Sequence, residues 1–234
     1  MHPPAILSSV TDFLIVGSIM ATILCLGVVA WRAELKRMRE LAAGLAQAGL
    51  EVVTSPTDEQ KRSAFETLGP FRDLRDGPRG IVWCARGHVQ GREVTLVEHK
   101  YTTGSGKNRT TVRHTVAAIV ASDRWPALSL VEENLLHKIA EMFGSKDLKL
   151  ENDAFNKRWR ITTDDPEFAT LVLSPEVQSW SMALPPRTMI RIGRGGMCLA
   201  TNWVVKLENA QRLVSGVCEL AALLPPELDA WGEA

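Results

Sequence analysis

The sequence predicts an α+β protein with an N-terminal transmembrane helix and stalk, followed by an antiparallel β meander packed against helices. Three observations lead to this fold class. An 18-residue run, 13–30, contains neither a charged residue nor a proline. Segments rich in valine and threonine, separated by glycine turns, follow from residue 80. Later segments repeat apolar residues at helical spacing, and two of them begin with a proline and an acid.

The apolar run Phe13–Ala30 predicts a membrane anchor. As a helix it would be about 27 Å long, which matches the roughly 30 Å hydrocarbon core of a bilayer. Trp31 at its end suits the interfacial region. A cleaved signal peptide is the alternative, because Val28-Val29-Ala30 resembles a cleavage site. Against this alternative, no Lys or Arg precedes the run, and the run exceeds the roughly 7–15 residues of such peptides.

Flanking charges set the expected orientation. Four cations follow the apolar run within nine residues: Arg32, Lys36, Arg37 and Arg39. The positive-inside bias therefore predicts a single-pass plasma-membrane protein, with 1–12 as a short extracytoplasmic tail and the C-terminal domain in the cytoplasm. Residues 31–114 carry 15 Lys and Arg against 10 Asp and Glu, and this excess suits the anionic inner leaflet.

Charge and cysteine content narrow the classes of partner. The formal net charge is zero, so no nucleic acid is expected. The four cysteines show no paired spacing, which fits a reducing compartment. The N-terminal helix is expected to bind the lipid bilayer. This helix carries a stripe of small residues, Gly17, Ala21 and Cys25, along which two helices could pair. The stripe makes a homodimer possible, but such stripes are common and it is not evidence for one.

The chain after the anchor is expected to form a stalk and then one domain. Residues 31–48 keep apolar residues at helical spacing, and Thr57 can cap a short helix at Asp58–Leu68. We therefore predict a juxtamembrane helical stalk over 31–69. Residues 70–234 are predicted as a cytoplasmic α+β domain, in which Trp125 marks an optional boundary between two related β-plus-helix lobes.

The order of elements in this domain follows from turns and periodicity. Strands are predicted first, as a meander over 80–90, 93–102 and 110–122. The remaining elements are expected in this order: a helix at Glu132–Phe143, a strand pair at Leu148–Glu151 and Phe155–Thr162, short helices starting at Asp165-Pro166 and Ser174-Pro175, a hairpin of Met189–Ile192 with Met197–Thr201, an extension at Trp203–Leu207, and a closing helix at Asn209–Leu224.

Several short segments follow one another in a specific order over about residues 75–225: Val97–Tyr101, the glycine, serine and lysine hairpin that follows, Thr115-Val116, Leu128–Glu132, Phe155 with Trp159, Asp164-Asp165, and the helix before Leu224-Pro225. In this order the chain resembles an uncharacterised family of bacterial, chiefly actinobacterial, membrane-anchored proteins with a domain of unknown function. The resemblance implies a membrane helix followed by a cytoplasmic α+β part, with no established activity. It implies no role for His114 or Arg158.

Glycine-rich turns are the first candidate sites. Gly104–Lys107 matches a phosphate-binding loop only in part, because Tyr101 stands where the motif needs a glycine and Asn108 where it needs Ser or Thr. We interpret this segment as a hairpin tip, and Gly193–Gly196 as a similar turn. The cations on the first hairpin are expected to contact anionic lipid or a partner: Lys107, Arg109 and Arg113.

No catalytic, cofactor-binding or metal-binding residue is predicted. Cys84 and His88 share a strand face near His99 and His114, but a zinc site needs a full set of converging ligands. The paired acids Glu132-Glu133 and Asp164-Asp165 lie at expected helix starts, where the helix dipole accounts for them.

The preferred hypothesis for function is a membrane-tethered, non-enzymatic interaction or scaffolding domain at the cytoplasmic face, with a protein partner at the inner membrane surface. Two alternatives stay open. One is an enzyme that acts on a membrane-associated substrate, and the other is a structural subunit of a membrane complex.

Overall fold

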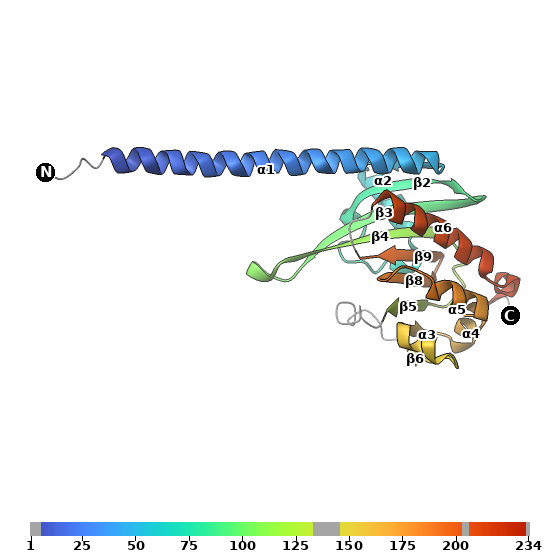
Figure 1. Ribbon diagram of the computed structural model, residues 1–234. Coiled ribbons are helices and arrows are strands. Elements are labelled where there is room, and N and C mark those ends of the chain that lie inside the picture. The colour runs from blue at the N-terminus through green and yellow to red at the C-terminus, as the bar shows by residue number, and fades with distance from the viewer. Residues whose placement is uncertain (1–5, 133–145, 203–205, 233–234) are drawn as a thin grey trace. The chain divides into compact units, whose positions relative to one another are not determined.

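The computed structural model describes residues 6–132, 146–202 and 206–232 (Figure 1). The chain divides into two compact units, Met1–Leu41 and Ala42–Ala234.

The N-terminal apolar helix is confirmed. Helix α1 runs from Ile6 to Gln47, so the predicted anchor and the first part of the predicted stalk form one helix. Among the described residues it is long and apolar enough to cross a membrane, since its most apolar window has a mean hydropathy of 2.3. Large apolar side chains between Leu14 and Trp31 are exposed, Leu24 to 70% and Ile19 to 54%.

The second unit contains an antiparallel sheet, which confirms the α+β fold class. In its described residues nine strands pair in the order β1-β2-β3-β4-β9-β8-β5-β7-β6. Every pairing is antiparallel. The strands are β1 Leu50–Val53, β2 Ile81–Val89, β3 Arg92–Thr103, β4 Thr110–Val120, β5 Leu128–Glu132, β6 Lys146–Leu148, β7 Trp159–Thr163, β8 Thr188–Gly193 and β9 Gly196–Thr201. Strands before and after Trp125 belong to one continuous sheet, and the kinship of two lobes stays a prediction.

The predicted hairpins are confirmed. Strands β2, β3 and β4 form the meander. Strands β8 and β9 are joined through Arg194 and Gly195, whose φ angles are 50° and 85°. Positive φ at both central residues is the geometry that suits the twist of a two-residue hairpin.

Helices cover both faces of the sheet. Side chains on each strand alternate between these faces, so neighbouring residues of one strand contact different helices. Helix α6 (Leu207–Leu223) packs on β2, β3, β4 and β9. Its Gly216 lies against Leu199. On the opposite face, the Cys198 thiol lies 3.1 Å from the carbonyl oxygen of Leu68. That face is covered by α2 (Asp58–Glu66) and the short 3-10 helices η1 (Gly69–Phe71) and η2 (Gly77–Gly80).

Capping residues place the short helices as predicted. Thr57 and Gln60 form a capping box at the start of α2. Asp165 accepts hydrogen bonds from two backbone N–H groups of α4 (Pro166–Val172), and Ser174 accepts one from α5 (Pro175–Met182). The closing helix is also confirmed as α6, which starts two residues before the predicted position.

The predicted strand Phe155–Thr162 is wrong in its first half. Helix α3 (Asp153–Arg158) occupies these residues, and only Trp159–Thr163 form a strand. The physical reason is local, because the Asn152 side chain accepts a hydrogen bond from the Phe155 N–H at 3.1 Å and so caps a helix. Its partner strand β6 likewise lies earlier than Leu148–Glu151.

Two further differences concern strand ends. Strand β1, four residues long, was not predicted. Glu132 is the last residue of β5, so it does not start a helix. The rest of the helix expected at Glu132–Phe143 lies outside the described residues, as does most of the extension at Trp203–Leu207.

Candidate functional site

The β3–β4 hairpin continues beyond the sheet as a two-stranded ribbon (Figure 1). Strand β2 pairs with β3 only as far as His99, and β9 pairs with β4 only from Thr115. Between these two residues the strands pair with each other alone, from Lys100↔Arg113 to Thr103↔Thr110. We refer to residues 100–114 as the basic ribbon.

The basic ribbon carries cations and no acid. Its four cations are Lys100, Lys107, Arg109 and Arg113. Of these, Lys100, Lys107 and Arg109 are exposed. Two of the three cations that the sequence singled out, Lys107 and Arg109, therefore lie together at the exposed tip. Such a surface favours anionic partners, whether phosphate groups or carboxylates.

Arg113 is held differently from the other two predicted cations. It forms an ion pair with Glu98, whose side chain is fully buried, while the Arg113 side chain is 30% exposed. The second oxygen of Glu98 accepts a hydrogen bond from the indole Nε1 of Trp83 at 3.0 Å. Because its charge is balanced within the fold, Arg113 fastens the base of the ribbon.

The tip of the ribbon depends on Gly104. Its φ is +82°, and a Cβ at this position would lie 2.2 Å from the backbone oxygen of Asn108. A side chain here would require the loop to move. A short 3-10 turn, Gly106–Asn108, follows and places Lys107 at the end of the hairpin.

A row of aromatic and histidine rings lies on the ribbon's other face. The rings of Tyr101 and His114 stack, with centroids 5.8 Å apart, and His99 lies opposite His114. Burial, together with the nearby charges of His99 and Arg191, lowers the pKa of His114 to about 4. A base of this strength is poorly matched to proton transfer near neutral pH, so we assign the row to packing.

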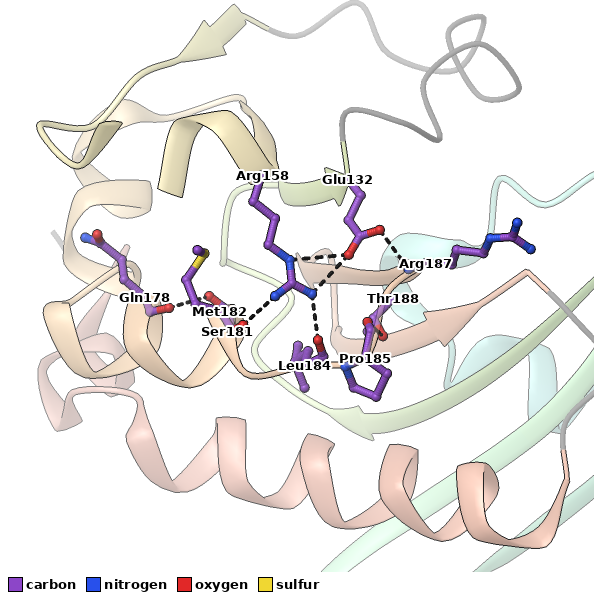
Figure 2. A network of polar contacts seen from close by, with 9 residues as sticks. All are labelled: Glu132, Arg158, Gln178, Ser181, Met182, Leu184, Pro185, Arg187 and Thr188. Atoms are coloured by element: carbon purple, nitrogen blue, oxygen red, sulfur yellow. Dashed lines mark hydrogen bonds and ion pairs between the residues drawn. The ribbon is translucent and has the colours of Figure 1, made fainter. Parts of the chain in front are cut away.

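The acid Glu132 belongs to a second polar network, at the end of β5 (Figure 2). One carboxylate oxygen accepts hydrogen bonds from Arg158 Nε and Nη2 at 3.3 and 3.0 Å. The other accepts one from the backbone N–H of Arg187 at 2.7 Å. Arg158 also donates to the carbonyl oxygens of Met182 and Leu184. The network ties β5 to the chain that follows α5, and these contacts occupy both carboxylate oxygens.

The histidines and cysteine weighed as metal ligands do not form a cluster. Cys84 is buried and His88 is exposed, although His99 and His114 are paired on adjacent strands. Within residues 6–132, 146–202 and 206–232, no group of three His, Cys, Asp or Glu could hold a metal ion.

Several polar residues of the fold lie outside the sequence predictions. Arg191 is almost fully buried and donates to Asp73 at 2.9 Å and to the carbonyl of Pro70 at 3.1 Å. Arg86 lines a cavity beside α2. A charged residue in the middle of an apolar strand pattern is the signal that could have singled out both residues.

Comparison with known proteins places the fold but no activity. No protein-family model and no curated protein matches the sequence. The chain is similar to the crystal structure of the mycobacterial trehalose monomycolate transport factor A, TtfA, with a TM-score of 0.52. The two sequences are 13% identical, and the match covers 80% of this chain and 96% of that one. At this identity the similarity concerns the fold.

Proposed function

We propose that this protein is a membrane-tethered, non-enzymatic interaction protein that binds a partner at the cytoplasmic face through its basic ribbon. The observation that carries the proposal is the acid-free ribbon, which extends from the sheet and exposes Lys107 and Arg109 at its tip. A two-stranded ribbon on its own is only marginally stable in water. A ribbon that nevertheless extends beyond the sheet therefore favours a role in binding a partner.

The tether is helix α1. Between Leu14 and Trp31 its large apolar side chains are exposed, as expected of a helix surrounded by lipid. Four Lys and Arg residues follow this segment, and residues 1–12 contain neither, which supports a cytoplasmic position for the second unit. The basic excess of residues 31–114 would bring the domain to the anionic leaflet.

The likeness to a transport factor supports a role beside a transporter. TtfA is named for the transport of trehalose monomycolate, and its chain matches this fold over 96% of its length. We infer that this fold, joined to a membrane helix, serves here as an accessory to a membrane transport process. The actinobacterial source of that structure agrees with the family that the sequence resembles.

Site-specific cross-linking in the native membrane tests the proposal. A photo-cross-linking amino acid at Ser105, which is exposed at the ribbon tip, would report what the tip touches in the full-length protein. We expect one protein partner or anionic lipid to be captured, and the double change Lys107→Ala and Arg109→Ala to reduce capture about tenfold through lost charge attraction.

A matched control separates the tip from net charge. Lys149→Ala with Lys157→Ala removes two exposed cations elsewhere on the domain and should leave capture unchanged. Arg113 is kept in both variants, because removing it would leave the buried Glu98 without its ion pair. Equal capture by the tip variant and the wild type would contradict the proposal.

A further inference from the structure

A cavity of about 320 Å³ lies between the first two strands of the sheet and helix α2. Its lining residues come from three elements: Glu51 and Val53 of β1, Glu59, Gln60 and Ser63 of α2, and Cys84 and Arg86 of β2. Cavities that bind small ligands begin at about 300 Å³, so this one suits a ligand the size of an amino acid or a dipeptide.

Arg86 offers an incomplete set of hydrogen bonds in this cavity. Its Nη1 donates to the Ser63 hydroxyl at 2.9 Å. Its Nε and Nη2 are buried and have no hydrogen-bond partner in the described structure. Buried polar groups are nearly always paired, so two unpaired donors on one guanidinium call for a ligand.

The unpaired atoms form one edge of the guanidinium group. Nε and Nη2 point their N–H bonds in parallel, and this fork matches the two oxygens of a carboxylate. Burial raises the pKa of the neighbouring Cys84 thiol, so the thiol is neutral and supplies no charge to balance Arg86.

Two acidic residues of the cavity indicate which charge the rest of the ligand carries. Glu51 lies directly opposite Arg86 on the neighbouring strand, and Glu59 lies on α2. Both are exposed, so they lie toward the solvent side of the cavity. Two carboxylates against one guanidinium disfavour a dianion such as phosphate, and they favour a ligand that also carries positive charge.

We propose that this cavity binds a small zwitterionic ligand of amino-acid type, with its carboxylate on the Nε–Nη2 edge of Arg86 and a cationic group near Glu51 and Glu59. The site is separate from the basic ribbon and does not rest on the role proposed for it. Val53 and Cys84 are paired two positions further along the same strands and line the cavity as apolar and neutral groups.

Calorimetric titration of the full-length protein in a non-ionic detergent tests this site. The ligands are L-arginine, L-lysine, L-glutamate, acetate and inorganic phosphate. We expect the two cationic amino acids to bind, acetate and glutamate to bind at least about tenfold more weakly, and phosphate to be weakest. Absence of binding by both cationic amino acids, or tighter binding of phosphate, would overturn the proposal.

Variants identify the atoms responsible. Arg86→Gln should weaken L-arginine binding by about ten- to a hundredfold, and Arg86→Lys, which keeps the charge but loses the fork, should also weaken it. Arg62→Gln removes an exposed arginine of α2 that does not line the cavity, and it should bind as the wild type does.

A second variant keeps the test decisive if Arg86→Gln does not fold. The double change Glu51→Gln and Glu59→Gln leaves Arg86 intact. It should reduce the ratio of the affinity for L-arginine to the affinity for acetate. An unchanged preference, or full binding by a folded Arg86→Gln protein, would contradict the proposed site.

Discussion

His114 sits at the junction between the sheet and the basic ribbon, where its ring is buried against Tyr101. Its Nδ1 atom has no hydrogen-bond partner among the described groups. Burial disfavours a charged imidazole here, and the nearby charges of His99 and Arg191 add to this effect, so the fold favours the neutral ring. Glu98, which lies nearby, is also buried, and its carboxylate forms an ion pair with Arg113. The base of the basic ribbon therefore combines a neutral imidazole with a buried carboxylate that is paired with an arginine.

This arrangement predicts that the free energy of unfolding decreases as the pH is lowered. The unfolded His114 takes up a proton near its ordinary pKa of about 6.5, whereas the folded one does so only near 4, so acid favours unfolding between these values. The loss approaches about 3 kcal/mol below pH 4. Urea unfolding of the detergent-solubilised protein, followed by tryptophan fluorescence from pH 7.5 to 4.5, measures it. His114→Phe should flatten the slope, and the exposed His88→Phe should not. Equal slopes in wild type and His114→Phe would contradict the assignment.

At the scale of elements, the β3–β4 pair combines two environments. Its inner half lies between β2 and β9, and its outer half, the basic ribbon, pairs only with itself. Threonines face each other across the ribbon at Thr102↔Thr111 and Thr103↔Thr110, which suits strand pairing without providing a core. The ribbon is therefore built to stay extended but to open more readily than the sheet.

Hydrogen exchange should resolve these two halves. Amides of 100–103 and 110–114 are expected to exchange about tenfold or more faster than those of 95–98 and 116–119, because the ribbon opens without disturbing the sheet. Exchange of the full-length protein, followed by peptide mass spectrometry, measures the difference. Equal protection along the whole hairpin would mean that the ribbon is supported by contacts beyond its own pairing.

Local patterns were enough to predict much of this fold. The meander, the proline-led helices and the hairpin around Gly193–Gly196 follow from turn chemistry and capping, which act between residues close in sequence. The start of α3 was missed because an apolar strand pattern outweighed the cap at Asn152. The site was harder to predict, since the Arg113–Glu98 pair and the Arg86 cavity depend on strand register and on where α2 packs.

At the scale of the whole molecule, the proposed function requires that helix α1 cross a membrane with the second unit on the cytoplasmic side. Helix α1 is apolar enough to do so, and its flanking cations lie on one side alone. A ribbon that binds a partner at the inner membrane surface requires that the second unit face the cytoplasm, and the three buried free thiols of that unit would suit such a reducing compartment.

Alkaline phosphatase fused after Ala234 tests this claim most directly, because the enzyme is active only outside the cytoplasm. We predict an inactive fusion that fractionates with the membrane, and an active one when Arg32, Lys36, Arg37 and Arg39 are changed to Glu and lysines are added before Phe13. Phosphatase activity in the unaltered fusion would contradict the cytoplasmic orientation, and recovery of that fusion in the soluble fraction would contradict the anchor.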